Sequence, residues 1–133
     1  EYDFNGKKVL LVEDNAFNRE IATELLEDYG FDVTTAQDGN LAVDIMKSAK
    51  EGDFDLILMD IQMPTIDGYE ATKQIRALNS EMSKLPIIAM TANAFEEDRK
   101  KALNVGMDEH ITKPINLNEL KSTLARILSR KRS

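Results

Sequence analysis

The chain has 133 residues, and 17 Lys and Arg against 24 Asp and Glu give it a net charge of −7. This acidity argues against direct binding to nucleic acids or to an anionic membrane surface. The absence of cysteine excludes disulfides, thiolate catalysis and Cys-ligated zinc. No apolar run approaches the roughly 20 residues of a membrane span, and no charged-then-apolar leader follows Glu1. We therefore predict one cytoplasmic domain over residues 6–130, with flanking ends at 1–5 and 131–133 and no separate output domain.

Short apolar runs alternate with helical stripes along the first half of the chain. Val9–Val12 is the first run, and it predicts a strand. The stripe that follows predicts a helix that Gly30 ends; it consists of Ala22, Leu25, Leu26 and Tyr29. Residues 31–36 predict a second strand. A second stripe then predicts a helix that Gly52 closes; it consists of Ala42, Ile45, Met46 and Ala49.

The same alternation continues into the second half. Leu56–Met59 is apolar at every position, which is typical of a strand covered on both faces. A stripe for the next helix follows, made of Ala71, Ile75 and Leu78. Residues 87–90 predict a fourth strand and residues 110–112 a short last one.

Two capping boxes predict where the last two helices begin. Asn93 with Glu96 indicates a helix near 95–105, and Gly106 ends it. Asn116 with Glu119 caps a final helix, whose stripe is Leu117, Leu120, Leu124, Ile127 and Leu128. Strands that alternate with helices in this way predict an α/β fold, a doubly wound parallel sheet with helices on both faces.

Ligands of such sheets bind at the carboxyl ends of the strands, so the residues just after each run matter most. Those residues are Glu13, Asp14, Asp60, Thr91 and Lys113. If the first and third strands are neighbours, the three carboxylates converge. Their mutual repulsion, about 1–4 kcal/mol for each pair at about 4 Å, is relieved by a divalent cation, and oxygen-only ligands suit Mg²⁺.

The same groups together match transfer of a phosphoryl group to Asp60. A carboxylate can serve as the nucleophile, while Mg²⁺ and the ammonium of Lys113 neutralise phosphoryl oxygens and Thr91 bonds one of them. Each residue alone also has a simpler explanation, as a helix cap, a turn former or ordinary loop and strand chemistry. The specific signal is their conjunction at one sheet edge.

The chain resembles the response-regulator receiver domains of two-component signalling over about residues 6–130. The matching stretches are Val9–Asn15 (VLLVEDN), Leu58–Pro64 (LMDIQMP) with Asp67-Gly68, Pro86–Ala92 (PIIAMTA) and Lys113-Pro114. The resemblance implies a flavodoxin-like (βα)5 fold with five parallel strands in the order 2-1-3-4-5 and five helices. It also implies a cis peptide between Lys113 and Pro114.

The resemblance further implies a role for each site residue. Asp60 is the expected phosphoacceptor, Lys113 pairs with the phosphoryl group, and Thr91 moves to meet it. Asp14 and Asp60 would bind Mg²⁺ directly with the backbone carbonyl of Gln62, and Glu13 would act through water. The expected partner is a histidine kinase or a histidine phosphotransfer protein, whose phosphohistidine is the donor.

One position departs from the family pattern. The switch residue on the last strand is commonly Tyr or Phe, whereas this chain has His110. A histidine there could still swing between inward and outward positions, and it could make that swing dependent on pH. We therefore keep His110, with Thr91, as a candidate switch residue rather than a metal ligand.

Several alternatives stay open. A phosphatase with an aspartate nucleophile needs a second acid where this chain has Gln62. An FMN carrier shares the architecture, but Glu13 and Asp14 would repel its phosphate. A pure interaction module with a dead pocket is a third reading. The stretches around residues 2–8, 61–64 and 90–94 resemble receivers attached to hybrid histidine kinases, and a stand-alone phosphorelay receiver is the rival.

Overall fold

Five parallel strands form one sheet in the computed structural model, which describes residues 5–92 and 96–131. The strands are β1 (Lys8–Val12), β2 (Asp32–Ala36), β3 (Leu56–Asp60), β4 (Ile87–Thr91) and β5 (Glu109–Thr112). Their order is β2-β1-β3-β4-β5, and every neighbouring pair is parallel. The predicted fold class and strand order are therefore confirmed.

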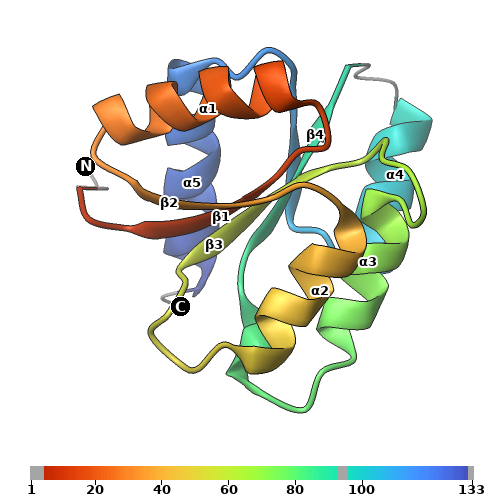
Figure 1. The fold of residues 1–133 in the computed structure, drawn as a ribbon. Coiled ribbons are helices and arrows are strands. Elements are labelled where there is room, and N and C mark those ends of the chain that lie inside the picture. Colours follow the sequence, from red (N-terminus) through yellow and green to blue (C-terminus); the bar gives the residue numbers. More distant parts are fainter. Residues whose placement is uncertain (1–4, 93–95, 132–133) are drawn as a thin grey trace.

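Helices cover both faces of this sheet (Figure 1). They are α1 (Ala16–Asp28), α2 (Gly39–Ser48), α3 (Gly68–Arg76), α4 (Glu96–Val105) and α5 (Leu117–Lys131), with a short 3-10 helix, η1 (Glu81–Lys84). α1 and α5 pack on one face, and α2, α3 and α4 pack on the other. The sequence pattern did not predict η1.

Two apolar layers explain why the central strands carry no polar alternation. Leu11 and Leu58 face Leu26 of α1, whereas Leu10 and Met59 belong to the layer beneath α2 and α3. Every residue of β3 and β4 is buried. A strand covered on both faces must be apolar throughout, so a carboxylate or hydroxyl at the last position of such a strand stands out.

Side-chain caps fix where several helices begin. Asn15 caps α1, Asp38 caps α2 and Asp67 caps α3, each accepting a hydrogen bond from the backbone amide three residues on. The predicted cap of the last helix is present, since the Glu119 amide donates to Asn116 Oδ1 at 3.0 Å. The other predicted cap, Asn93, lies outside the described residues.

Glycines end two helices as predicted, at Gly30 and Gly106, whose φ angles are +105° and +108°. The prediction that Gly52 closes α2 is wrong, because that helix ends at Ser48. Ala49 turns to extended backbone with ψ of 152°, and the carboxylate of Asp53 accepts a hydrogen bond from the Lys50 amide at 2.8 Å. The helix ends at this turn before the glycine is reached.

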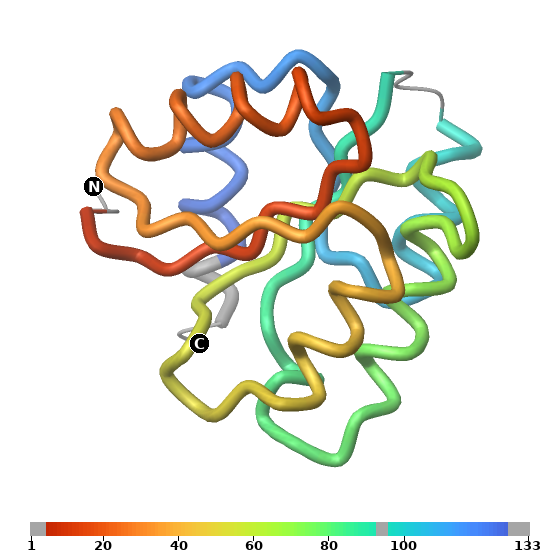
Figure 2. The backbone as a smooth tube through the Cα atoms, viewed as in Figure 1, coloured from red at the N-terminus to blue at the C-terminus, as the bar shows by residue number. Residues whose placement is uncertain are grey.

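The parallel arrangement carries the carboxyl ends of β1, β3 and β4 to one edge of the sheet, as the chain trace shows (Figure 2). The chain leaves β1 and crosses first to β2 on one side, then to β3 on the other, so the connections diverge at the β1–β3 pair. Such a switch point is where doubly wound sheets hold their ligands.

Candidate functional site

Three carboxylates meet at this switch point. Glu13 and Asp14 follow β1, Asp60 ends β3, and the two strands are directly paired. One carboxylate oxygen from each residue lies within 4.8 Å of the other two. Glu13 and Asp60 are buried, with 3% and 1% exposure, whereas Asp14 is exposed. The site therefore opens to solvent on the side of Asp14.

Lys113 places an ammonium against the two buried carboxylates. Its Nζ lies 3.2 Å from Glu13 Oε1 and 3.1 Å from Asp60 Oδ2. The residue follows β5, where its amide donates to the Thr91 carbonyl, and its peptide bond to Pro114 is cis, as predicted. Burial alone would lower the pKa of Lys113, but its ion pairs with Asp60 and Glu13 outweigh burial and raise it. Lys113 is therefore a fixed cation.

Asp60 retains capacity for another ligand. Its Oδ1 accepts a hydrogen bond from the Gln62 amide at 3.3 Å. Its Oδ2 is buried and, although Lys113 is close, accepts no hydrogen bond of good angle from the described residues. Burial first, and then the charge of Glu13, raise the pKa of Asp60 from 3.8 to about 7, against the opposing effect of Lys113.

This donor set fits a hard divalent cation. An incompletely bonded buried oxygen, two further carboxylates nearby and no nitrogen or sulfur ligand are the features that Mg²⁺ favours. One ammonium faces two buried carboxylates, so the buried part of the site carries excess negative charge. A cation at this place would supply the missing positive charge and complete the bonding of Asp60.

The turn between β1 and α1 is held by several hydrogen bonds. The Asn15 amide donates to Glu13 Oε2 at 3.2 Å, and the Glu13 amide donates to the carbonyl of Ala36. The guanidinium of Arg19 donates to the backbone carbonyls of Glu13 at 2.8 Å and Asp14 at 3.4 Å. Sequence reasoning missed Arg19. Its signal was a cation in the first turns of a helix, where the macrodipole disfavours one.

The turn between β3 and α3 brings backbone against the site. The Gly68 amide donates to the Ile61 carbonyl at 2.8 Å. A Cβ at position 68 would clash with the carbonyl oxygen of Asp60. Only glycine permits this approach, which holds the start of α3 against the end of β3.

The other predicted site residues come from the turn after β3 and from β4 and β5. Thr91, at the buried end of β4, and Gln62 line a cavity of about 380 Å³ together with Tyr69 of α3. His110 is half-buried on β5, in register with Ala89 of β4. The Nδ1 atom of His110 is buried, and no described residue hydrogen-bonds to it.

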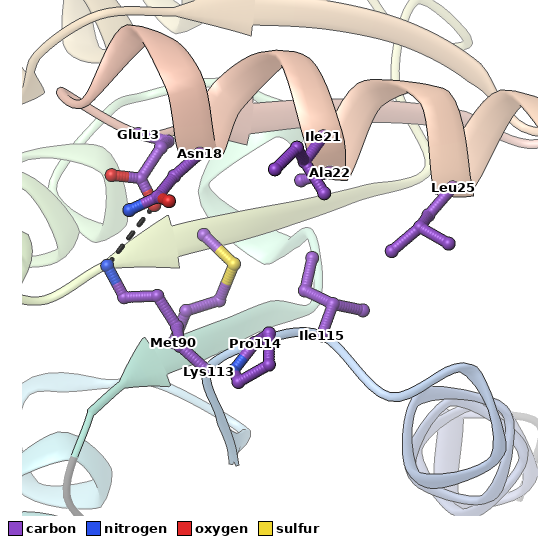
Figure 3. Close-up of a pocket in the computed structure, with 9 residues that line it drawn as sticks. All are labelled: Glu13, Asn18, Ile21, Ala22, Leu25, Met90, Lys113, Pro114 and Ile115. Carbon is purple, nitrogen blue, oxygen red and sulfur yellow. Dashed lines mark hydrogen bonds and ion pairs between the residues drawn. The ribbon is translucent and has the colours of Figure 1, made fainter.

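A second cavity, of about 300 Å³, adjoins the carboxylates on the α1 side (Figure 3). Glu13 and Lys113 stand at one end, joined by their ion pair, and Asn18 of α1 points toward them. The rest of the lining is mostly apolar and comes from α1, β4 and the segment after Lys113; it includes Ile21, Leu25, Met90 and Ile115.

Across the part of the chain that the structure describes, no helix combines the length and the apolar character needed to cross a membrane. The fold and the site together define a doubly wound α/β domain with an acidic, lysine-bearing pocket at its switch point. A family model described as the response regulator receiver domain matches residues 9–125. The chain belongs to this family.

Known proteins of high similarity agree. The chain is 46% identical over 113 residues to hybrid signal transduction histidine kinase I of Dictyostelium discoideum, covering 83% of this chain but only 6% of that protein. The receiver domain of sensor histidine kinase PA1611 from Pseudomonas aeruginosa, solved with magnesium in its active-site cleft, is 40% identical with a TM-score of 0.80. The match covers 91% and 96% of the two chains.

A co-crystal structure from Saccharomyces cerevisiae holds the histidine phosphotransfer protein Ypd1 and the receiver domain of Ssk1. It matches with 36% identity and a TM-score of 0.76, covering 88% of this chain and 85% of that one. The chain thus corresponds closely to isolated receiver domains, whereas it spans a small fraction of its hybrid-kinase relative.

Proposed function

We propose that the domain over residues 6–130 accepts a phosphoryl group onto Asp60 from a phosphohistidine, in a reaction that depends on Mg²⁺. The observation that carries this proposal is the state of Asp60. Its carboxylate is buried at the end of a strand, incompletely hydrogen-bonded, 3.1 Å from an ammonium and beside two more carboxylates. A purely structural aspartate has no need of these neighbours.

In the proposed step, a carboxylate oxygen of Asp60 attacks the phosphorus and forms the P–O bond of an acyl phosphate. The P–N bond to the donor imidazole breaks, and the leaving nitrogen keeps its electron pair and takes a proton from solvent. Lys113 stays charged and neutralises a phosphoryl oxygen, while the hydroxyl of Thr91 donates to another. Each such charge-assisted hydrogen bond contributes about 1.5–3 kcal/mol.

Mg²⁺ is the cofactor that the donor set supports. Asp14, Asp60 and the backbone carbonyl of Gln62 would hold the ion directly, and Glu13 would reach it through water. When bound, the ion neutralises charge on the phosphoryl oxygens. The magnesium in the cleft of the related PA1611 receiver supports the same assignment here.

The donor would be a histidine kinase or a histidine phosphotransfer protein. A relative that contains a matching segment is a hybrid histidine kinase, and a related receiver crystallises with such a phosphotransfer protein. We propose that this receiver belongs to a hybrid sensor kinase and works in the cytoplasm, with a stand-alone phosphorelay receiver as the alternative. Phe17 and Ile21 are exposed on α1, and Ile21 also lines the 300 Å³ cavity that Glu13 and Lys113 border, so the two side chains offer a partner an apolar contact on α1.

Phosphorylation adds roughly −1.5 to −2 charge to the pocket. In our proposal Thr91 moves toward this charge, and the space near β5 that it leaves is open to His110. The two residues would act together as the switch that reshapes the surface of α4, β5 and α5. Differential hydrogen bonds of a few kcal/mol are sufficient to shift a two-state equilibrium of comparable gap.

The test is labelling with a small phosphodonor, with and without Mg²⁺, followed by intact mass spectrometry. We expect one acid-stable, base-labile phosphoryl group per chain in wild type and none in Asp60→Asn. Asp44→Asn, an exposed carboxylate on α2, is the matched control and should label like wild type. Full labelling of Asp60→Asn would contradict the assignment.

Three other observations separate the alternatives. Sustained turnover of small phosphoesters would favour a phosphatase, and a purified protein that is yellow would favour an FMN carrier. Failure to bind either Mg²⁺ or the phosphoryl mimic beryllofluoride would favour an interaction module with an inactive pocket.

A further inference from the structure

Arg19 of α1 holds the turn that carries Glu13 and Asp14, which we call the acidic turn. Glu13 and Asp14 sit where β1 has ended and α1 has not yet begun, so the sheet ladder fixes only the amide of Glu13. The two carbonyls of this turn are fixed by a side chain. Arg19 donates from one guanidinium nitrogen to the carbonyl of Glu13 at 2.8 Å and to that of Asp14 at 3.4 Å.

The backbone of Arg19 is itself held in place by hydrogen bonds. Arg19 is half-buried, and its own amide makes the first backbone bond of α1, to the Asn15 carbonyl at 2.8 Å. Its carbonyl accepts a hydrogen bond from the Thr23 hydroxyl at 2.7 Å. Arg19 therefore links the first turns of the helix to the two residues whose carboxylates face Asp60.

Charge alone does not explain this arrangement. A cation near the start of a helix opposes the macrodipole. A cation on the backbone of the acidic turn also repels a divalent ion bound at that turn. The hydrogen bonds to the two carbonyls are the contribution that favours Arg19 at this place, because they orient the peptide units that carry Glu13 and Asp14.

We propose that Arg19 is a positioning residue that sets the affinity of the site for Mg²⁺ by fixing the backbone of Glu13 and Asp14. The inference deepens the proposed function and rests on it. Groups that orient metal ligands without touching the metal typically affect metal affinity by 10–100-fold. Arg19 acts on backbone carbonyls rather than on the ligand side chains, so an effect at the low end of that range is expected.

Positioning and charge predict opposite results for Arg19→Gln. Loss of the positive charge would tighten Mg²⁺ binding, whereas loss of the hydrogen bonds to the Glu13 and Asp14 carbonyls would weaken it. Arg19→Lys keeps the charge but has one donor group in place of the planar fork, so it should recover part of the affinity. The sign of the change therefore distinguishes the two effects.

The experiment is a MgCl₂ titration of the ¹⁵N-labelled domain, followed by the amide shifts of Asp14, Asp60 and Gln62. We expect the Kd for Mg²⁺ to rise about 10-fold in Arg19→Gln and about 3-fold in Arg19→Lys. Arg126→Gln is the matched control, because Arg126 pairs at 3.7 Å with Glu109, at the opposite end of the sheet from the site. Its Kd should equal that of wild type.

A second readout is the Mg²⁺ dependence of labelling by a small phosphodonor. Arg19→Gln should need about 10-fold more Mg²⁺ for half-maximal rate, while its rate at saturating Mg²⁺ stays near that of wild type. General loss of structure would lower the saturating rate instead, and circular dichroism checks the fold. If Arg19→Gln does not fold, Arg19→Lys decides, since an unchanged Kd in that variant overturns the proposal.

An Arg19→Gln domain that folds and binds Mg²⁺ as tightly as wild type, or more tightly, also overturns it. In that case wild type still binds Mg²⁺ and is labelled on Asp60, so the proposed function stands. A wild-type domain that takes up no Mg²⁺ overturns both proposals, and the two failures are therefore distinguishable.

Discussion

At the scale of single residues, Asp60 is where burial and charge conflict. Its pKa in the folded domain is raised to about 7 by burial and by Glu13, against 3.8 as the ordinary value. The folded state therefore binds a proton that the unfolded chain has already released between these two pH values. In metal-free buffer, the free energy of unfolding should fall as pH rises from about 4 to about 7 and level off above.

Asp60→Asn should remove this dependence, because an amide does not ionise. At pH 8 without metal, we expect the variant to exceed wild type in unfolding free energy by about 1–4 kcal/mol, and at pH 5 the difference should shrink. Urea denaturation in EDTA at both pH values measures this difference in unfolding free energy. The difference between the unfolding free energies of the two proteins at each pH removes the contribution of the other titrating groups. A difference that grows toward low pH would refute the assigned direction.

The sequence predicted which side chains would meet where a polar residue follows a predicted strand. Asp60 comes directly after an apolar run and Lys113 directly after the short last strand, and parallel pairing brings these strand ends together. Arg19 was not visible in this way, because its partners are backbone carbonyls, which every residue has. When a side chain donates to a backbone carbonyl, its partner can be any residue type, so the sequence pattern does not reveal the pair.

At the scale of elements, one arginine joins three segments at the amino ends of the strands, away from the site: the end of α3, η1 and the turn between α4 and β5. Arg76, the last residue of α3, donates to the carbonyls of Gly106, Ser83 and Leu85, at 2.6 to 2.8 Å. It also pairs at 3.0 Å with Asp108, whose same oxygen accepts from the Ile87 amide. These bonds hold η1 and the α4–β5 turn against α3.

Arg76→Gln should destabilise the domain by about 2–4 kcal/mol, because it leaves three partly buried carbonyls and the carboxylate of Asp108 with unmet hydrogen bonds. Phosphoryl labelling at 20 °C should be unchanged, since the network lies away from Asp60. Lys73→Gln, an exposed change on the same helix, should cost less than about 0.5 kcal/mol. Equal urea midpoints for both variants would show that the network contributes little.

Elements were predicted best where apolar periodicity dominates and worst where side-chain hydrogen bonds decide an end. The burial of Leu120, Leu124 and Ile127 follows the predicted stripe of α5. The helix α2 ends at Ser48 and not at Gly52, because the Asp53 carboxylate accepts a hydrogen bond from the Lys50 amide in the turn before that glycine. Likewise η1 is a short turn capped by Ser80, too brief for any periodic signal.

At the scale of the whole molecule, the order of the strands was partly inferred from the resemblance, since alternation alone gives a doubly wound sheet without its order. That order matters for function. It makes β1 and β3 neighbours and so brings Asp60 to Glu13 and Asp14, which precede it in the chain by 47 and 46 residues. The unfolded chain holds no such cluster, so a cation that needs all three groups binds only the folded state.

Mg²⁺ should therefore stabilise the domain through mass action. At ten times its Kd, the ion should add about 1.4 kcal/mol to the free energy of unfolding, or about 3–6 °C to Tm. Asp14→Asn should lose most of this gain and Asp44→Asn none of it, with NaCl at equal ionic strength as the baseline. The gain should also shrink from pH 8 toward pH 5, because the ion must then displace the proton on Asp60. A shift of equal size in Asp14→Asn, or one independent of pH, would place the ion elsewhere on this acidic protein.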